Sequence, residues 1–74
     1  MKMHIDKLIN EYVDKIINCD QLIDNLNFNK KQHRRNNNKL GFEECSTELK
    51  TKEAQRQAYV QAKIDIESLL DYAL

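Results

Sequence analysis

The sequence predicts an all-α fold: an antiparallel helical hairpin, one domain over residues 1–74, that is expected to dimerise into a four-helix bundle. The 74-residue chain has no proline and one glycine, Gly41. It therefore lacks the residues that reverse the strands of a β-sandwich or barrel roughly every 8 to 12 residues. Two stretches instead repeat apolar side chains at alternating steps of three and four, the pattern of packed helices. A chain this short buries little apolar surface on its own, and this shortage predicts a homodimer.

The first helix is expected over residues 3–27. Its apolar seam advances by steps of four and three without a break, and the seam residues are Ile5, Ile9, Tyr12, Ile16, Cys19, Ile23 and Leu26. Leu8, Val13 and Leu22 widen this seam into the broad apolar face of a core-facing helix. Ile17 lies off the seam beside Val13, where it extends the apolar face toward a second partner.

A basic loop is expected over residues 29–41. The asparagines at positions 27, 29 and 36–38 are poor helix formers, and asparagine tolerates the left-handed conformation that ends helices. The loop carries five cations and no acid; the cations are Lys30, Lys31, Arg34, Arg35 and Lys39. The whole chain has 12 basic and 12 acidic residues, so the remainder carries a net charge of −5. The zero net charge therefore hides a strong polarity.

The second helix is expected over residues 43–73. Its seam residues are Phe42, Cys45, Leu49, Lys52, Arg56, Tyr59, Lys63, Ile66, Leu70 and Ala73. This seam is apolar at both ends and cationic in the middle, and a parallel stripe of Ala58, Ala62 and Leu69 thickens it. The candidate N-caps are Asn38, Ser46 and Thr47. The residues expected to form the hairpin and dimer interface are Ile5, Ile9, Tyr12, Ile16, Ile23, Leu26, Phe42, Leu49, Tyr59, Ile66 and Leu70.

A hairpin turn centred near residue 35 determines which residues of the two helices face each other. It places Arg56 near Asp14, which allows a partly buried ion pair. Alternatively, the alkyl stems of the seam cations lie along the seam while their charges reach water, and this interpretation is preferred because it needs no special geometry. The same register separates Cys19 and Cys45 by about 9 Å along the axis. Both cysteines are therefore expected as free thiols.

No catalytic residue, metal ligand or cofactor is expected, and the chain is predicted not to be an enzyme. A two-helix hairpin offers no cleft for a substrate. Cys19 and Cys45 occupy seam positions, where a free cysteine usually acts as a small buried hydrophobe. Zinc ligands come in closely spaced pairs, whereas Cys19, His33 and Cys45 are at least a dozen residues apart.

Contact with a membrane is not expected either. The longest apolar run has three residues, far short of the roughly 20 that cross a bilayer. The first residues also lack the apolar stretch of an export signal. The expected location is therefore the cytoplasm.

The basic segment is the candidate binding site. Its candidate residues are Lys30, Lys31, His33, Arg34, Arg35 and Lys39. Three interpretations remain open: a solvated loop whose charges favour the end of the first helix, a contact for an acidic protein surface, or a site for nucleic acid. In the last case the cations would neutralise phosphates, and Phe28 and Phe42 would flank them as stacking groups.

The chain resembles the small uncharacterised helical proteins encoded by phages and prophages of low-GC Gram-positive bacteria. The similarity rests on the amphipathic start at residues 5–12, the polar basic middle, and the alanine-rich residues 58–63 running into residues 68–72. The resemblance implies a protein that binds and regulates or inhibits a host or phage protein, and it transfers no site residues. The alternative function is a nucleic-acid-binding accessory protein that uses the basic loop at residues 30–39.

Overall fold

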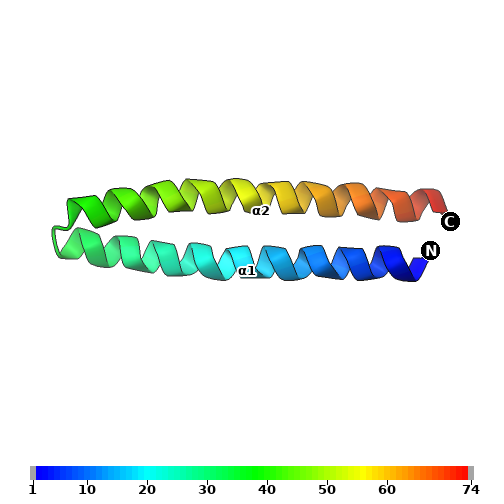
Figure 1. Cartoon of the computed structure of the whole chain (residues 1–74), viewed down its shortest axis with the longest axis horizontal. Helices are drawn as coiled ribbons and strands as arrows, with labels where there is room; N and C mark the ends of the chain where they lie inside the picture. The colour runs from blue at the N-terminus through cyan, green and yellow to red at the C-terminus, as the bar shows by residue number, and fades with distance from the viewer. Residues whose placement is uncertain (1, 74) are drawn as a thin grey trace.

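Two long antiparallel helices make up the fold. The computed structural model describes the backbone of residues 2–73 and the side chains of residues 4–70. Helix α1 spans Lys2–Arg35 and helix α2 spans Lys39–Ala73, with no strand in the described part of the chain. The helices lie side by side, with the turn at one end of the rod and both chain ends at the other (Figure 1). The Cα trace measures 56 × 14 × 11 Å. The predicted all-α hairpin is therefore confirmed.

The connection between the helices is much shorter than the sequence predicted. In place of a loop over residues 29–41, α1 continues to Arg35 and α2 begins at Lys39, which leaves only residues 36–38 between them. Lysine, glutamine and arginine are good helix formers, and they outnumber the asparagines between positions 29 and 35. Three basic side chains also occupy the last turn of α1, where positive charge is favoured by the helix dipole. The basic segment is thus mostly helical.

The register of the hairpin stays close to the one expected for a turn centred near residue 35, since Tyr12 packs against Tyr59 and Lys30 against Phe42. Arg56 was expected near Asp14, but its Nε donates a hydrogen bond to the Asp20 carboxylate at 2.5 Å. Farther from the turn, the rings of Tyr12 and Tyr59 pack with their centroids 6.1 Å apart. Lys15 covers both rings, with its Nζ 4.9 Å from the Tyr12 centroid and 5.5 Å from the Tyr59 centroid. These contacts between side chains of the two helices therefore stabilise the register of the hairpin.

The core of the hairpin is thin. Only Cys19, Cys45 and Leu49 are buried among the hydrophobic side chains described, and none of these side chains is fully buried. The other residues predicted to line the seam are half-buried within residues 4–70, and the seam position Ala73 lies outside the residues whose side chains are described. The large apolar side chains that remain exposed are Leu8, Ile17, Leu22, Phe28, Leu40, Ile64 and Leu69. One hairpin therefore leaves a large part of its apolar surface in contact with solvent.

Candidate interaction sites

The turn at the tip of the hairpin is built by asparagines. Asn37 adopts a left-handed conformation with φ 56°, which asparagine tolerates better than most residues. The Asn37 N–H donates to the Arg34 carbonyl at 3.3 Å, and the Asn38 N–H donates to the His33 carbonyl at 2.8 Å. This pair of hydrogen bonds is a Schellman motif, which satisfies carbonyls at the end of a helix. The cap of α1 is therefore encoded in the asparagine run.

Asn38 also starts the next helix. Its Oδ1 accepts a hydrogen bond from the Gly41 N–H at 3.0 Å, the geometry of an N-cap. Its Nδ2 lies 3.1 Å from the His33 Nδ1, which places the His33 ring against the start of α2. Of the three candidate N-caps, Ser46 and Thr47 instead lie inside α2, where their hydroxyls donate to the carbonyls four residues earlier. One side chain thus joins both helix ends.

The only glycine lies where the helices meet at the tip. Gly41 is buried and has no positive φ, so the backbone conformation does not require glycine. A Cβ on Gly41 would instead lie 2.6–2.8 Å from three atoms of the His33 ring. Glycine is therefore needed for the close approach of α2 to His33.

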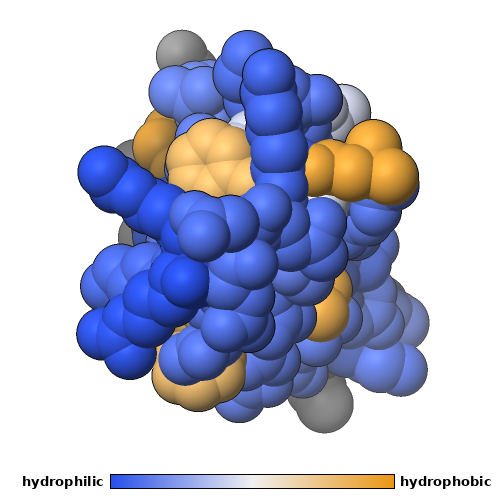
Figure 2. Space-filling model, turned by 90° about the vertical axis from the view of Figure 1, so that its left-hand side faces the viewer, coloured by the Kyte–Doolittle hydropathy of each residue, from blue (hydrophilic) through white to orange (hydrophobic). Residues whose placement is uncertain are grey.

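The cations of the basic segment surround this tip. Lys31, Arg34, Arg35 and Lys39 are exposed, whereas His33 is half-buried. Lys30 is also half-buried, and its Nζ lies 4.8 Å from the centroid of the Phe42 ring. Figure 2 looks onto the tip and shows a mostly hydrophilic face interrupted by a few hydrophobic side chains. The structure thus brings together cations that the sequence placed on a loop.

Two hollows lie between these cations. The larger, of about 520 Å³, is lined by His33, Arg34, Asn37, Asn38, Lys39 and Phe42. The smaller, of about 250 Å³, is lined by Asn27, Lys30, Lys31, Arg34 and Phe42. Arg34 and Phe42 line both hollows, so a guanidinium and an aromatic ring stand at the centre of the basic tip.

A second candidate site lies along one flank of the rod. Six residues line a groove of about 350 Å³, and this apolar groove is formed by Val13, Ile16, Ile17, Val60, Lys63 and Ile64. Ile17 and Ile64 are 50% and 49% exposed, although isoleucine is usually buried. The sequence indicated Ile17 as an extension of the apolar face, but it did not indicate Ile64. The apolar groove is thus an unpartnered apolar surface shared by both helices.

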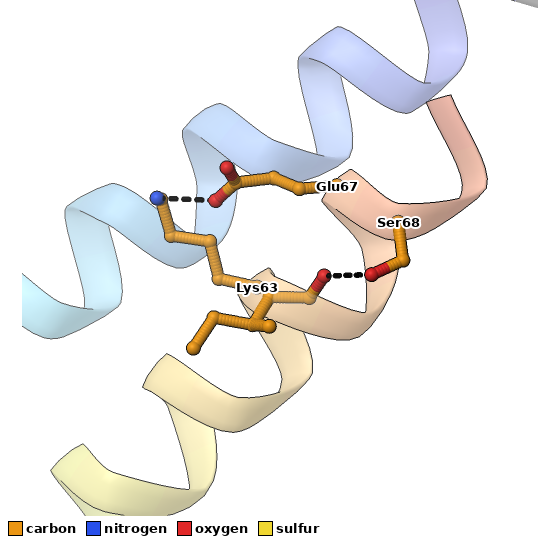
Figure 3. A network of polar contacts seen from close by, with 4 residues as sticks. Lys63, Glu67 and Ser68 are labelled. Carbon is orange, nitrogen blue, oxygen red and sulfur yellow. Dashed lines mark hydrogen bonds and ion pairs between the residues drawn. The ribbon is translucent and has the colours of Figure 1, made fainter. Parts of the chain in front are cut away.

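Charged pairs close both ends of the apolar groove. Toward the turn, Asp20 pairs with Arg56, and both side chains are nearly half exposed. Toward the chain ends, the Lys63 Nζ donates to Glu67 at 2.5 Å along α2 (Figure 3). Lys52 reaches only Gln55, at 3.3 Å. The preferred interpretation of the seam cations therefore describes Lys52, whereas Arg56 and Lys63 each pair with a carboxylate.

The opposite flank carries a second set of apolar residues, of which Leu8, Leu22 and Leu69 are exposed and Ala62 is half-buried. Leu8 and Leu22 lie 14 residues apart on α1, at heptad positions on the other side of the seam from Val13. Ala62 and Leu69 occupy the equivalent positions on α2. Leu69 is 56% exposed. We call these four residues the leucine flank.

Neither cysteine lies in a reactive setting. Cys19 and Cys45 are both free and buried. In the described chain, no three residues among histidine, cysteine, aspartate and glutamate gather closely enough to hold a metal ion. Within the same residues, neither helix combines the length and apolar character needed to span a membrane.

Comparison with protein-family models, with curated proteins and with solved structures finds no match to this chain.

Proposed function

We propose that this protein is a small non-enzymatic interaction protein that regulates or inhibits a protein partner. The observation that carries the proposal is the apolar groove, which exposes Ile17 and Ile64 in the middle of a folded rod. Exposed contiguous apolar surfaces rimmed by charge are typical of protein-binding sites. The resemblance to phage-encoded proteins supports a host or phage protein as the partner, and we propose that the two meet in the cytoplasm.

The lining of the apolar groove favours one kind of occupant. The carboxylates of Asp20 and Glu67 near its two ends are already paired with Arg56 and Lys63, so the ends carry both signs of charge. The groove itself is lined by apolar side chains of both helices. A helix of another protein fits such a groove if it carries apolar residues at steps of three and four. We assign such an amphipathic helix to the groove.

The leucine flank suits a second copy of the chain. A twofold axis between Leu8 and Leu22 would place Leu22 of each copy against Leu8 and Leu69 of the other. The small side chain of Ala62 lies between these leucines and lets two helices approach closely. The result would be a four-helix bundle, the common way for helical hairpins to complete a core. The homodimer is thus proposed at this flank, which leaves the apolar groove and both tips free.

A photo-crosslinker tests the apolar groove directly. Benzoylphenylalanine at Ile64, in the cells that produce the protein, should crosslink to one segment of another protein that has this amphipathic pattern. The substitution Ile17→Asp should remove this product, because the new carboxylate would have to be buried against the apolar face of the partner helix. The matched variant Ala54→Asp places the same charge on an exposed position outside the groove and should leave the product unchanged.

Two results would contradict the proposal. One is a crosslink from Ile64 only to a second copy of the chain. The other is an identical set of products when the crosslinker stands at Ala54, which would mean that the groove has no special affinity. Circular dichroism of both variants should match the unmodified protein, since Ile17 and Ala54 are exposed.

A further inference from the structure

We propose that the tip of the hairpin binds single-stranded nucleic acid. In this site, Lys31, Arg34, Arg35 and Lys39 contact the phosphates and Phe28 stacks on a base. This inference is independent of the apolar groove, because it concerns charged side chains at the turn and not apolar side chains along the flank of the rod.

The charge of the tip favours a polyanion. The four cations are all exposed, and residues 29–41 contain no acid that would neutralise them. Lys31, Arg34 and Arg35 belong to the last turns of α1, and Lys39 begins α2. Positive side chains from two rigid helix ends are therefore held around one surface. Arginine suits this role because its guanidinium can bind a phosphate through two hydrogen bonds.

Two hollows in this surface provide places where a ligand can bind. Both are lined by Arg34 and Phe42, and each also includes at least one lysine. Lys30 already covers the Phe42 ring, so it is held in place rather than free to follow a ligand. A phosphate at Arg34 would thus lie between lysines from both helices.

An exposed aromatic ring favours nucleic acid over an acidic protein surface as the ligand of the tip. Phe28 is 62% exposed, whereas the other aromatic side chains described, Tyr12, Phe42 and Tyr59, are half-buried. It precedes Lys31 by three residues and Arg35 by seven, so all three lie on one face of α1. Cations that follow a backbone, together with a ring on which bases stack, are the two parts of a single-strand binding site.

The width of the tip favours a single strand over a duplex. The Cα trace of the paired helices is 14 × 11 Å across, and side chains widen it further. The major groove of B-DNA is about 12 Å wide and admits one helix. The tip with both its helices is too broad to enter that groove, whereas a single strand can wrap around it.

Fluorescence anisotropy with a labelled oligothymidylate tests the site in the full-length chain. Four phosphate contacts predict that the logarithm of the binding constant falls with the logarithm of salt concentration with a slope of about −3. The triple variant Lys31→Gln, Arg34→Gln and Arg35→Gln should reduce the slope to about −1. The control is Lys7→Gln, Lys50→Gln and Lys52→Gln, which removes the same charge from the rest of the rod and should keep the steep slope.

A second pair of variants tests the stacking. Phe28→Ala should weaken binding by about five- to 100-fold without changing the slope, because it removes stacking and no charge. Leu40→Ala shortens another exposed side chain of the tip, 67% exposed, and should have little effect because leucine has no aromatic face. Equal effects of the two substitutions would overturn the stacking role.

Three other results would overturn the proposal as a whole. The first is a control triple variant that loses as much affinity as the tip variant. The second is polyglutamate competing as well as oligothymidylate at equal charge, which would indicate an acidic protein surface as the ligand. The third is a DNA duplex competing better than the single strand.

Discussion

At the tip, the Gly41 backbone of α2 lies so close to the His33 ring of α1 that no Cβ fits between them. Replacing Gly41 with alanine in a helix normally raises the unfolding free energy by about 0.5–1 kcal/mol. Here the new Cβ would meet the His33 ring, which is held by Asn38. We expect Gly41→Ala to lower the unfolding free energy by about 1–2 kcal/mol, since overpacking outweighs the gain in propensity.

A double-mutant cycle isolates this clash. In the background of His33→Ala, Gly41→Ala should instead raise the unfolding free energy by about 0.5–1 kcal/mol, because the ring is gone and only the propensity remains. Urea unfolding of the four proteins measures the difference. The same loss in both backgrounds would show that His33 is not the reason for glycine at this position.

At the level of residues, the sequence was informative about local chemistry and silent about contacts across the turn. Asn38 could be proposed as an N-cap because capping depends on its own side chain and the next few residues. The role of Gly41 could not be predicted, because it depends on a ring from the other helix. The exposure of Ile64 was also missed, although Val60 and Ile64 are spaced by four just as Val13 and Ile17 are.

The two helices differ in how far their apolar patterns reach. The first helix was predicted to end near residue 27 because asparagines follow, and the next positions at the seam spacing are Lys30 and His33. Both side chains nevertheless pack on α2, Lys30 over Phe42 and His33 against Gly41. The three-four spacing therefore continues past the last apolar seam residue, Leu26, into the last turn of the helix.

The seam of α2 contains a cation that a helix core does not need. Arg56 pairs with Asp20, but 43% and 48% of the two side chains are exposed, and exposed pairs contribute little to stability. Replacing Arg56 with leucine adds apolar burial on the seam. We expect Arg56→Leu to raise the unfolding free energy by about 1 kcal/mol.

Lys50→Leu is the matched control for this substitution, because Lys50 is exposed and lies off the seam. It should leave the free energy of unfolding, measured in urea, nearly unchanged. A loss of stability in Arg56→Leu would instead indicate that the pair with Asp20 holds the register of the hairpin.

On the scale of the whole molecule, the rod has three surfaces that differ in their side chains. Five cations gather at the turn, the apolar groove lies on one flank, and the leucine flank lies on the other. The sequence predicted the polarity of charge and the shortage of core, since both follow from counts along the chain. It could not show which apolar residues of the two helices lie at the same level along the rod, because that depends on the register set by the short turn.

The shortage of core limits the stability of a single hairpin. A single small core rarely supplies more than about 3–5 kcal/mol, and no side chain described in this hairpin is fully buried. Association through the leucine flank would add the missing burial, and its contribution grows with protein concentration. Leu69→Lys should remove that contribution, whereas Ile64→Lys, at a similarly exposed position in the apolar groove, should preserve it.

Urea unfolding followed by circular dichroism, over a wide range of protein concentrations, tests this claim most directly. We expect the dilute chain to unfold with a free energy below about 5 kcal/mol, and the midpoint to rise with concentration in the unmodified protein and in Ile64→Lys but not in Leu69→Lys. A midpoint that is independent of concentration, with an unfolding free energy well above that value, would show that the hairpin is stable alone and would contradict the account.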